Sequence, residues 1–176
     1  IKVQDVDGNG VITTDDRIIY SQRPDVTFGF NNTFNYKGFD LSVFLYARLG
    51  QWIAYDYNTT YRINALENGG NVDYWTPENP TNAFPRPNKS KSYTQVTYYS
   101  TLKYEDGSFF KIRDITLGYT FKPELLKHLN LSRLRVYATA KNFFTFSKID
   151  NYDPEQGGSI SFPMTKQLVF GLNVEF

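Results

Sequence analysis

Residues 165–176, the last twelve of the chain, alternate between apolar and polar side chains at almost every position. Because successive side chains of a β-strand point to opposite sides, this pattern predicts a strand with one apolar and one polar face. The apolar positions are Leu168, Phe170, Leu172, Val174 and Phe176, and the polar ones are Gln167, Gly171, Asn173 and Glu175. A strand on the surface of a soluble protein shows the same alternation, so this segment alone leaves the environment of the apolar face open.

The same alternation recurs in four more segments, at 26–36, 39–48, 109–121 and 132–144. Each is roughly ten residues long or longer, which is the length that a tilted strand needs to cross a bilayer. The first half of 109–121 is less regular, and this predicts a β-bulge there. The repetition favours an all-β fold, a transmembrane antiparallel β-barrel, to which these segments contribute the last strands.

The connections between these segments alternate in length as well. Lys37 and Gly38 form a short hairpin turn and 122–131 is of moderate length, whereas 49–108 and 145–164 are long. Short turns on one side and long loops on the other are typical of barrels in bacterial outer membranes, with the long loops outside the cell. The chain is therefore expected to comprise an extracellular segment 1–25, a hairpin 26–48, a long extracellular loop 49–108, and the last three strands within 109–176.

Composition is compatible with this interpretation and narrows the alternatives. The chain has 14 Tyr and 15 Phe in 176 residues, which suits aromatic girdles at a membrane interface as well as a large β core. No stretch is apolar for long enough to form a transmembrane helix. Cys is absent, and a formal net charge of +1 gives no electrostatic case for nucleic acid.

The start of the chain has neither an initiator Met nor an export signal. Five strands are also fewer than the roughly eight of the smallest membrane barrels. We therefore expect residues 1–176 to be the C-terminal part of a larger chain, processed or divided before residue 1.

A twelve-residue segment at 5–16 has the spacing of a calcium-binding loop. In such a loop, oxygens at the first, third, fifth, seventh, ninth and twelfth positions surround the ion, and Gly at the sixth allows a sharp turn. The corresponding residues are Asp5, Asp7, Asn9, Val11 through its carbonyl, Thr13 and Asp16, with Gly10 at the turn. The pattern predicts Ca²⁺ as a permanent structural pin. A regulated calcium switch and an Asx-rich turn without metal are the other two interpretations.

Seven segments in one order along the chain resemble the SusC/RagA-type TonB-dependent transporters of Bacteroidota outer membranes. They are 5–17 (DVDGNGVITTDDR), 36–42 (YKGFDLS), 75–80 (WTPENP), 108–121 (SFFKIRDITLGYTF), 134–148 (LRVYATAKNFFTFSK), 152–155 (YDPE) and 171–176 (GLNVEF). The resemblance implies a barrel of about 22 strands with an N-terminal plug. It also implies a TonB partner acting through that plug, a SusD-like surface lipoprotein over the extracellular mouth, and a dimer of such pairs. Neither the plug nor the TonB-binding segment can lie within these residues.

The resemblance also assigns a role to the C-terminal strand, which the barrel-assembly machinery recognises in such proteins. Gly171, Val174 and Phe176 fit that signal, whereas Val169 stands where a polar residue is usual. Phe176 as a plain anchor in the membrane interface is compatible with this role.

The long loop at 49–108 is rich in aromatic residues, which could stack on a sugar face or a peptide side chain of the cargo. They are Trp52, Tyr55, Tyr57, Tyr61, Tyr74, Trp75, Tyr93, Tyr98 and Tyr99. Most aromatics in so long a loop fold back to stabilise it, and Trp52, Tyr74 and Trp75 are the candidates for cargo contact. The polar faces of the strands carry Asp40, Arg48, Asp114, Arg135 and Lys141, which are expected to pair with one another in a hydrated barrel interior.

Catalysis is not expected. Glu105 with Asp106, and Asp153 with Glu155, are the candidate carboxylate pairs of a glycoside hydrolase, but both lie in turn-like contexts where no strand-borne partner is expected. The single His128 has no second His or Cys for a zinc site or a triad. A soluble, calcium-stabilised β-sandwich that binds carbohydrate is the alternative outside transport, and it would require two packed sheets.

Overall fold

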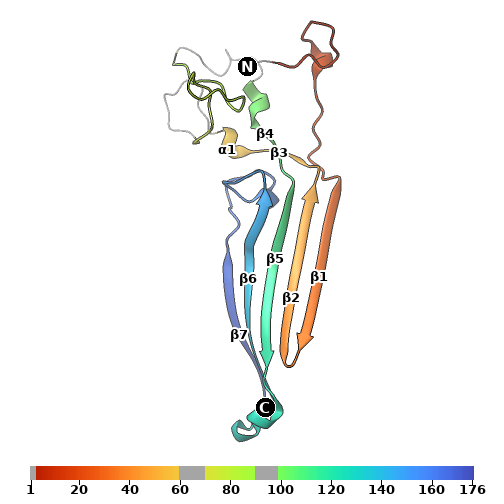
Figure 1. Cartoon of the computed structure of the whole chain (residues 1–176), viewed down its shortest axis with the longest axis vertical. Coiled ribbons are helices and arrows are strands. Elements are labelled where there is room, and N and C mark those ends of the chain that lie inside the picture. Colours follow the sequence, from red (N-terminus) through yellow and green to blue (C-terminus); the bar gives the residue numbers. More distant parts are fainter. Residues whose placement is uncertain (1–2, 60–69, 90–98) are drawn as a thin grey trace.

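A five-stranded antiparallel sheet forms the body of the computed structural model, which describes residues 3–59, 70–89 and 99–176 (Figure 1). The strand order is β1-β2-β5-β6-β7, so strands of this sheet that follow one another along the chain are neighbours in space. The strands are β1 (Val26–Tyr36), β2 (Phe39–Leu49), β5 (Phe109–Thr120), β6 (Arg133–Ser147) and β7 (Gln167–Glu175). All five segments predicted from alternation are strands. β6 continues three residues past the predicted end at Phe144.

The pairing register places apolar residues opposite apolar residues across all four ladders. Together they form one continuous surface, the apolar face. Its members are Val26, Phe28, Phe30, Asn32, Phe34, Tyr36, Phe39, Leu41, Val43, Leu45, Ala47, Leu49, Phe110, Ile112, Ile115, Leu117, Tyr119, Leu134, Val136, Ala138, Ala140, Phe144, Phe146, Leu168, Phe170, Leu172 and Val174. This face carries no Asp, Glu, Lys or Arg along these five fully described strands, and Asn32 is its one strongly polar member.

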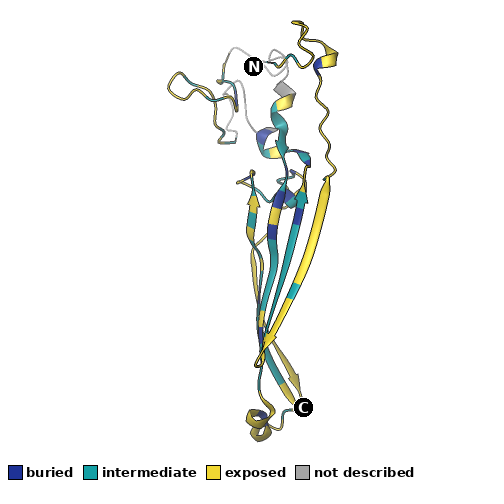
Figure 2. Ribbon diagram, turned by 45° about the vertical axis from the view of Figure 1, so that its right-hand side comes forward, coloured by how far each residue is buried: buried dark blue, intermediate teal, exposed yellow. Residues whose placement is uncertain are grey.

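No second sheet covers the apolar face within the described residues, and the sheet is a single curved layer (Figures 1 and 2). Phe170 is 77% exposed and Leu172 is 68% exposed, while Leu41 and Leu134 are half-buried. The other sheet in the described part is a short antiparallel pair of β3 (Trp52–Ala54) with β4 (Tyr104–Asp106), two strands that lie far apart in the sequence. The two packed layers that a soluble sandwich requires are therefore not present in the described residues.

A double β-bulge preserves the alternation where the sequence is irregular. Arg113 has no register partner on β2 or β6, and Asn142 on β6 adopts a left-handed φ of 58°. Asn tolerates this conformation better than other residues except Gly. At this point β5 has one residue without a register partner, Arg113, and β6 has two, Asn142 and Phe143, so that Phe144 and Phe146 pair with Ile112 and Phe110 on the apolar face. The predicted bulge in 109–121 is confirmed at Arg113.

The two short connections lie at the same end of the sheet as the C-terminus (Figure 1). Lys37 and Gly38 make the two-residue turn between β1 and β2 with φ values of 48° and 90°, as in the tight hairpins that suit twisted strands. A Cβ added at Gly38 would lie 2.8 Å from the carbonyl oxygen of Thr120, so only Gly fits. The second connection holds a helical turn, α2 (Pro123–Leu126), followed by a 3₁₀ turn, η4 (Lys127–Leu129).

The long segments gather at the opposite end of the sheet (Figure 1). They contain β3, β4, α1 (Asp56–Thr59) and the 3₁₀ turns η1 (Thr14–Asp16), η3 (Tyr99–Lys103) and η5 (Pro154–Gln156). A hydrophobic core cluster lies here: Ile53, Tyr55 and Ile149 are buried, and Tyr152 packs against them. Burial raises the pKa of the Tyr55 hydroxyl to about 12. Among the helices of the described segments, none has both the length and the apolar character needed to cross a membrane.

Candidate functional sites

The loop at 5–16 brings three carboxylates together. One oxygen from each of Asp5, Asp7 and Asp16 lies within 4.8 Å of the other two. The backbone N–H groups of Gly8 and Gly10 each donate to Asp5 at 2.8 Å, and both glycines have positive φ, 73° and 84°. Gly10 thus takes the sharp turn that its position in the loop predicts.

Asp16 closes the loop from its far end. Its Oδ1 accepts the backbone N–H of Val6 and its Oδ2 accepts that of Thr13, both at 2.7 Å. These hydrogen bonds, that from Thr13 foremost, hold the pKa of Asp16 below its ordinary value. The carboxyl is therefore ionised at neutral pH beside two other acidic groups, an arrangement that a divalent cation would relieve.

The other predicted ligands lie in the same loop but make local contacts. Asn9 Oδ1 accepts the backbone N–H of Val11 at 2.8 Å, and Asn9 Nδ2 donates to Asp7 at the same distance. Thr13 Oγ1 accepts the backbone N–H of Asp15 at 3.1 Å. All the predicted ligand atoms are oxygens, which fits a hard cation such as Ca²⁺. The same contacts also occur in Asx-rich turns without metal.

The surface opposite the apolar face, here called the polar face, carries ion pairs across its strands. Arg135 on β6 donates two hydrogen bonds to the carboxylate of Asp40 on β2, one from Nε at 2.9 Å and one from a terminal nitrogen at 2.5 Å. The pair spans Gly118 of β5, where a Cβ would come within 2.5 Å of both side chains. Lys141 faces Asp114 at 3.9 Å. Four of the five charged residues predicted to pair on this face do so.

Arg48 is the exception. The Nε group of this half-buried side chain donates to the Tyr46 hydroxyl at 2.8 Å. No carboxylate within the described segments pairs with it. The expectation that Arg48 pairs with an acidic neighbour on the strands was therefore wrong, because the facing positions on β1 and β5 are Thr27 and Phe109.

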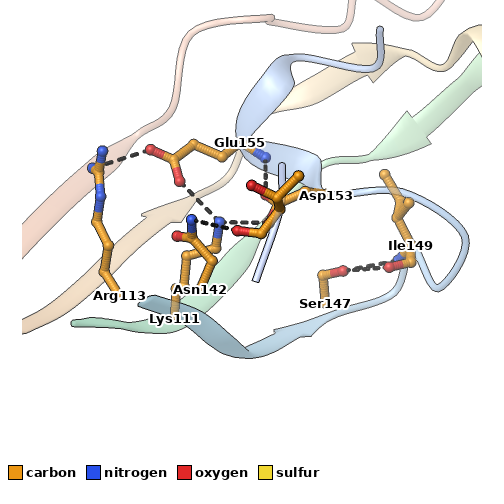
Figure 3. Close-up of polar contacts among 8 residues, drawn as sticks. Lys111, Arg113, Asn142, Ser147, Ile149, Asp153 and Glu155 are labelled. Atoms are coloured by element: carbon orange, nitrogen blue, oxygen red, sulfur yellow. Dashed lines mark hydrogen bonds and ion pairs between the residues drawn. The ribbon is translucent and has the colours of Figure 1, made fainter. Parts of the chain in front are cut away.

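Asp153 and Glu155 have strand-borne partners, contrary to the prediction. Lys111 of β5 donates to Asp153 at 2.6 Å and to Glu155 at 2.9 Å, and Arg113 lies 3.1 Å from Glu155 (Figure 3). The Lys111 side chain is fully buried. Asp153 also caps the 3₁₀ turn η5 by accepting the N–H of Glu155 at 3.0 Å. These four side chains, here called the loop latch, fasten the loop after β6 to the wall.

The three aromatic candidates for cargo contact differ in their surroundings. Trp52 is half-buried and packs on Tyr20, with ring centres 4.2 Å apart, so it stabilises the loops. Tyr74 and Trp75 are 43% and 41% exposed, and Trp75 lines an open cavity of about 500 Å³. Tyr61, Tyr93 and Tyr98 lie outside the described residues, and the side chain of Tyr99 is not described.

In the C-terminal strand, packing against a neighbouring side chain explains why Gly171, one residue of the predicted assembly signal, is a glycine. Gly171 pairs with Tyr137 of β6, and a Cβ there would come within 2.3 Å of the Tyr137 ring. Val174 is 41% exposed and Phe176 is 92% exposed. The assembly role of these three residues stays a prediction.

Comparison with known proteins explains this combination of open sheet, long loops and polar face. No family model matches the chain. It is 31% identical over 98% of its length to TonB-dependent receptor P3 of Formosa agariphila, of which it covers 18%. It is also 31% identical, over 98% of its length, to TonB-dependent receptor SusC of Bacteroides thetaiotaomicron, of which it covers 17%. The chain is similar to a segment of the SusC/RagA-type TonB-dependent receptors.

Solved structures agree with this relationship. The RagAB peptide importer in its closed-closed state matches 98% of the chain with a TM-score of 0.73 and 28% identity, over 20% of the RagAB chain. In the open-open state the match covers 94% with a TM-score of 0.66. The chain thus spans about a fifth of the length of the SusC/RagA-type proteins that it matches. These relatives bear the names of receptors and importers and not of enzymes, in agreement with the expectation that the chain is not catalytic.

Proposed function

We propose that this chain forms part of the barrel wall and outer loops of a TonB-dependent nutrient importer in the outer membrane of a Gram-negative bacterium. The observation that carries the proposal is the apolar face, which is continuous over five strands, free of charge and uncovered in the described residues. A face of this kind is stable against hydrocarbon, where a charged side chain at the bilayer centre would cost about 2–4 kcal/mol.

The polar face supports the other half of the proposal. Its ion pairs, Asp40 with Arg135 and Asp114 with Lys141, suit a hydrated lumen surrounded by the wall. The structural relative RagAB is a peptide importer. By this relationship the cargo is an oligopeptide or a glycan, taken up with a SusD-like surface lipoprotein as partner in a dimer of such pairs. TonB would act through a plug carried by the rest of the transporter.

The loop at 5–16 is proposed to bind Ca²⁺ as a structural pin of the extracellular segment. Three carboxylates within 4.8 Å and an all-oxygen donor set support this role. Asp5, Asp7, Asn9, Val11, Thr13 and Asp16 would hold the ion. A pin fits better than a switch, since extracellular calcium modules bind with Kd near about 10⁻⁴ to 10⁻³ M.

The loop aromatics complete the proposal at the mouth of the importer. Tyr74 and Trp75 present ring surface that suits stacking on a sugar or an aromatic side chain. Trp52 instead packs on Tyr20 of the N-terminal segment.

Membrane topology gives a direct test in the intact transporter. Single Cys residues at Glu78 and Glu124, both exposed, would report the two ends of the sheet, and this chain has no Cys of its own. We expect a membrane-impermeant maleimide to label Glu78→Cys on whole cells and Glu124→Cys only after the outer membrane is permeabilised. Equal labelling of both positions on whole cells would contradict the proposed orientation.

A further inference from the structure

Three cations meet at the loop end of the polar face. Lys111 and Arg113 of β5 bind the two carboxylates of the loop latch, Asp153 and Glu155. Arg48 of β2 stands beside them with no carboxylate among the described residues. This cluster therefore carries one positive charge that its own acidic residues do not balance.

Two aromatic rings fix the direction of the unbalanced guanidinium. The Arg48 Cζ atom lies 5.5 Å from the ring centre of Tyr46 and 6.0 Å from that of Phe109, which is only 1% exposed. Contacts of this kind orient a planar guanidinium by cation–π attraction. The Nε–H group of Arg48 donates to the Tyr46 hydroxyl, and among the described residues the N–H groups of its two terminal nitrogens have no hydrogen-bond acceptor.

A second guanidinium faces the same ring. The Arg113 Cζ atom lies 5.4 Å from the Tyr46 ring centre, and its side chain is 38% exposed although it also contacts Glu155. Both guanidinium groups therefore lie near the Tyr46 ring. Two guanidinium groups near one ring create a positive electrostatic potential on a surface that an incoming solute can reach.

The other strand-borne charges of this face show what is missing at Arg48. Arg135 has a carboxylate in bidentate contact, and Lys141 faces Asp114. A half-buried charge without a counter-ion is costly, and the planar fork of Arg matches a carboxylate better than any other common anion of organic solutes except phosphate. The unpaired donors of Arg48 are therefore suited to an anionic group that is not part of the described chain.

We propose that Arg48, supported by Tyr46 and Arg113, binds a carboxylate of the transported cargo at the outer end of the lumen. This inference rests on the proposed function, because it requires the polar face to line the import path. The carboxylate could belong to a peptide, at its C-terminus or on an acidic side chain, or to a uronic acid of a glycan.

Binding of matched probes to the purified whole transporter tests the inference. One arm compares a pool of short peptides with free C-termini against the same pool with amidated C-termini. The second arm compares oligogalacturonate with neutral oligogalactose of equal length. Bound probe is quantified by mass spectrometry after rapid removal of free probe. We expect the carboxylate member to be retained about tenfold better in one arm, as one charge-assisted bidentate contact implies, and that arm identifies the source.

The Arg48→Gln variant should reduce this preference to near unity, while Arg48→Lys should retain part of it. Arg133→Gln is the matched control, since Arg133 lies at the opposite end of the sheet and pairs with exposed Glu175. Equal retention of charged and neutral probes, retention of no carboxylate probe in either arm, or an unchanged preference in Arg48→Gln would overturn the inference.

The thermal unfolding midpoint of the variants distinguishes whether Arg48 binds cargo or an acidic residue of the same protein. If Arg48 served an acidic residue elsewhere in the same protein, Arg48→Gln would lower the unfolding midpoint of the cargo-free transporter, and this result would also overturn the inference. The proposed function would survive either failure, provided that the topology labelling of Glu78→Cys and Glu124→Cys still holds.

Discussion

Lys111 donates a hydrogen bond to Asp153 at 2.6 Å from a side chain with no solvent exposure, and the two residues are 42 positions apart in the chain. The contact joins the loop end of the sheet to the loop after β6. The carboxylates of Asp153 and Glu155 are only 12% and 11% exposed. The position of this loop therefore depends on buried charge pairing as well as on the small core around Ile149.

Replacing Lys111 by Met should release this loop without unfolding the sheet. The change leaves the Asp153 carboxylate buried without its cation, and breaking such a pair costs about 3 kcal/mol or more. Hydrogen exchange of residues 148–163 in the whole transporter should rise, while exchange in β5 and β6 stays slow. Lys148→Met is the control, because Lys148 is 79% exposed and its pair with Asp106 is worth at most about 1 kcal/mol. Equal effects of the two changes would refute the loop latch.

Removing two carboxylates of the calcium loop, with Asp7→Ala and Asp16→Ala, should loosen residues 3–25 and leave the wall intact. An ion bound there would tie down a loop and not the strand ladder. Limited proteolysis with and without a chelator measures this: the unmodified protein should be cut faster in chelator, and the double variant equally fast in both conditions. Asp15→Ala, outside the carboxylate cluster, is the control. Cleavage of the unmodified protein that ignores the chelator would argue against a bound ion.

The loop should also respond to acid when metal is absent. Hydrogen bonds from Thr13 and Val6 lower the pKa of Asp16 from its ordinary value of 3.8. A group with a depressed folded pKa contributes stability above its unfolded pKa and loses it as the pH falls through the folded value. In chelator, the amides of Val6 and Thr13 should stay protected above about pH 4 and lose protection, relative to their intrinsic exchange rates, below it. The same transition in Asp16→Asn would show that another group controls it.

Replacing Gly171 by Ala should weaken the closing strand, because the new Cβ would meet the Tyr137 ring at 2.3 Å. Overpacking of this kind typically costs about 1–3 kcal/mol. The unfolding midpoint and the folded fraction in the outer membrane should both fall. Adding Tyr137→Ser removes the clash and should restore them. A double variant that still fails to assemble would instead favour Gly171 as part of the recognition signal.

The five strands were predictable because the alternation of apolar and polar side chains along a strand can be seen from neighbouring residues alone. Three features were not predictable, because they depend on pairing between distant segments. The left-handed Asn142, which extends β6 to Ser147, follows from the bulge at Arg113 on the neighbouring strand. The partners of Lys111, and the lack of a carboxylate partner for Arg48 among the described residues, follow from the register of the whole sheet.

The carboxylate cluster of the loop at 5–16 was predictable for the opposite reason. Its ligand positions lie within twelve consecutive residues, so the spacing alone places Asp5, Asp7 and Asp16 near one another. The spacing does not determine whether an ion is bound.

Contact between the apolar face and lipid is the central claim, and a matched pair on β7 tests it most directly. Leu172 belongs to the apolar face, whereas its neighbour Asn173 faces Arg135 on the polar side. The whole transporter, labelled with a fluorophore at Leu172→Cys or Asn173→Cys, would be reconstituted in vesicles whose lipids carry brominated acyl chains. We predict strong quenching at position 172 and little at 173. Equal quenching at both positions, or quenching at 173 alone, would contradict the account.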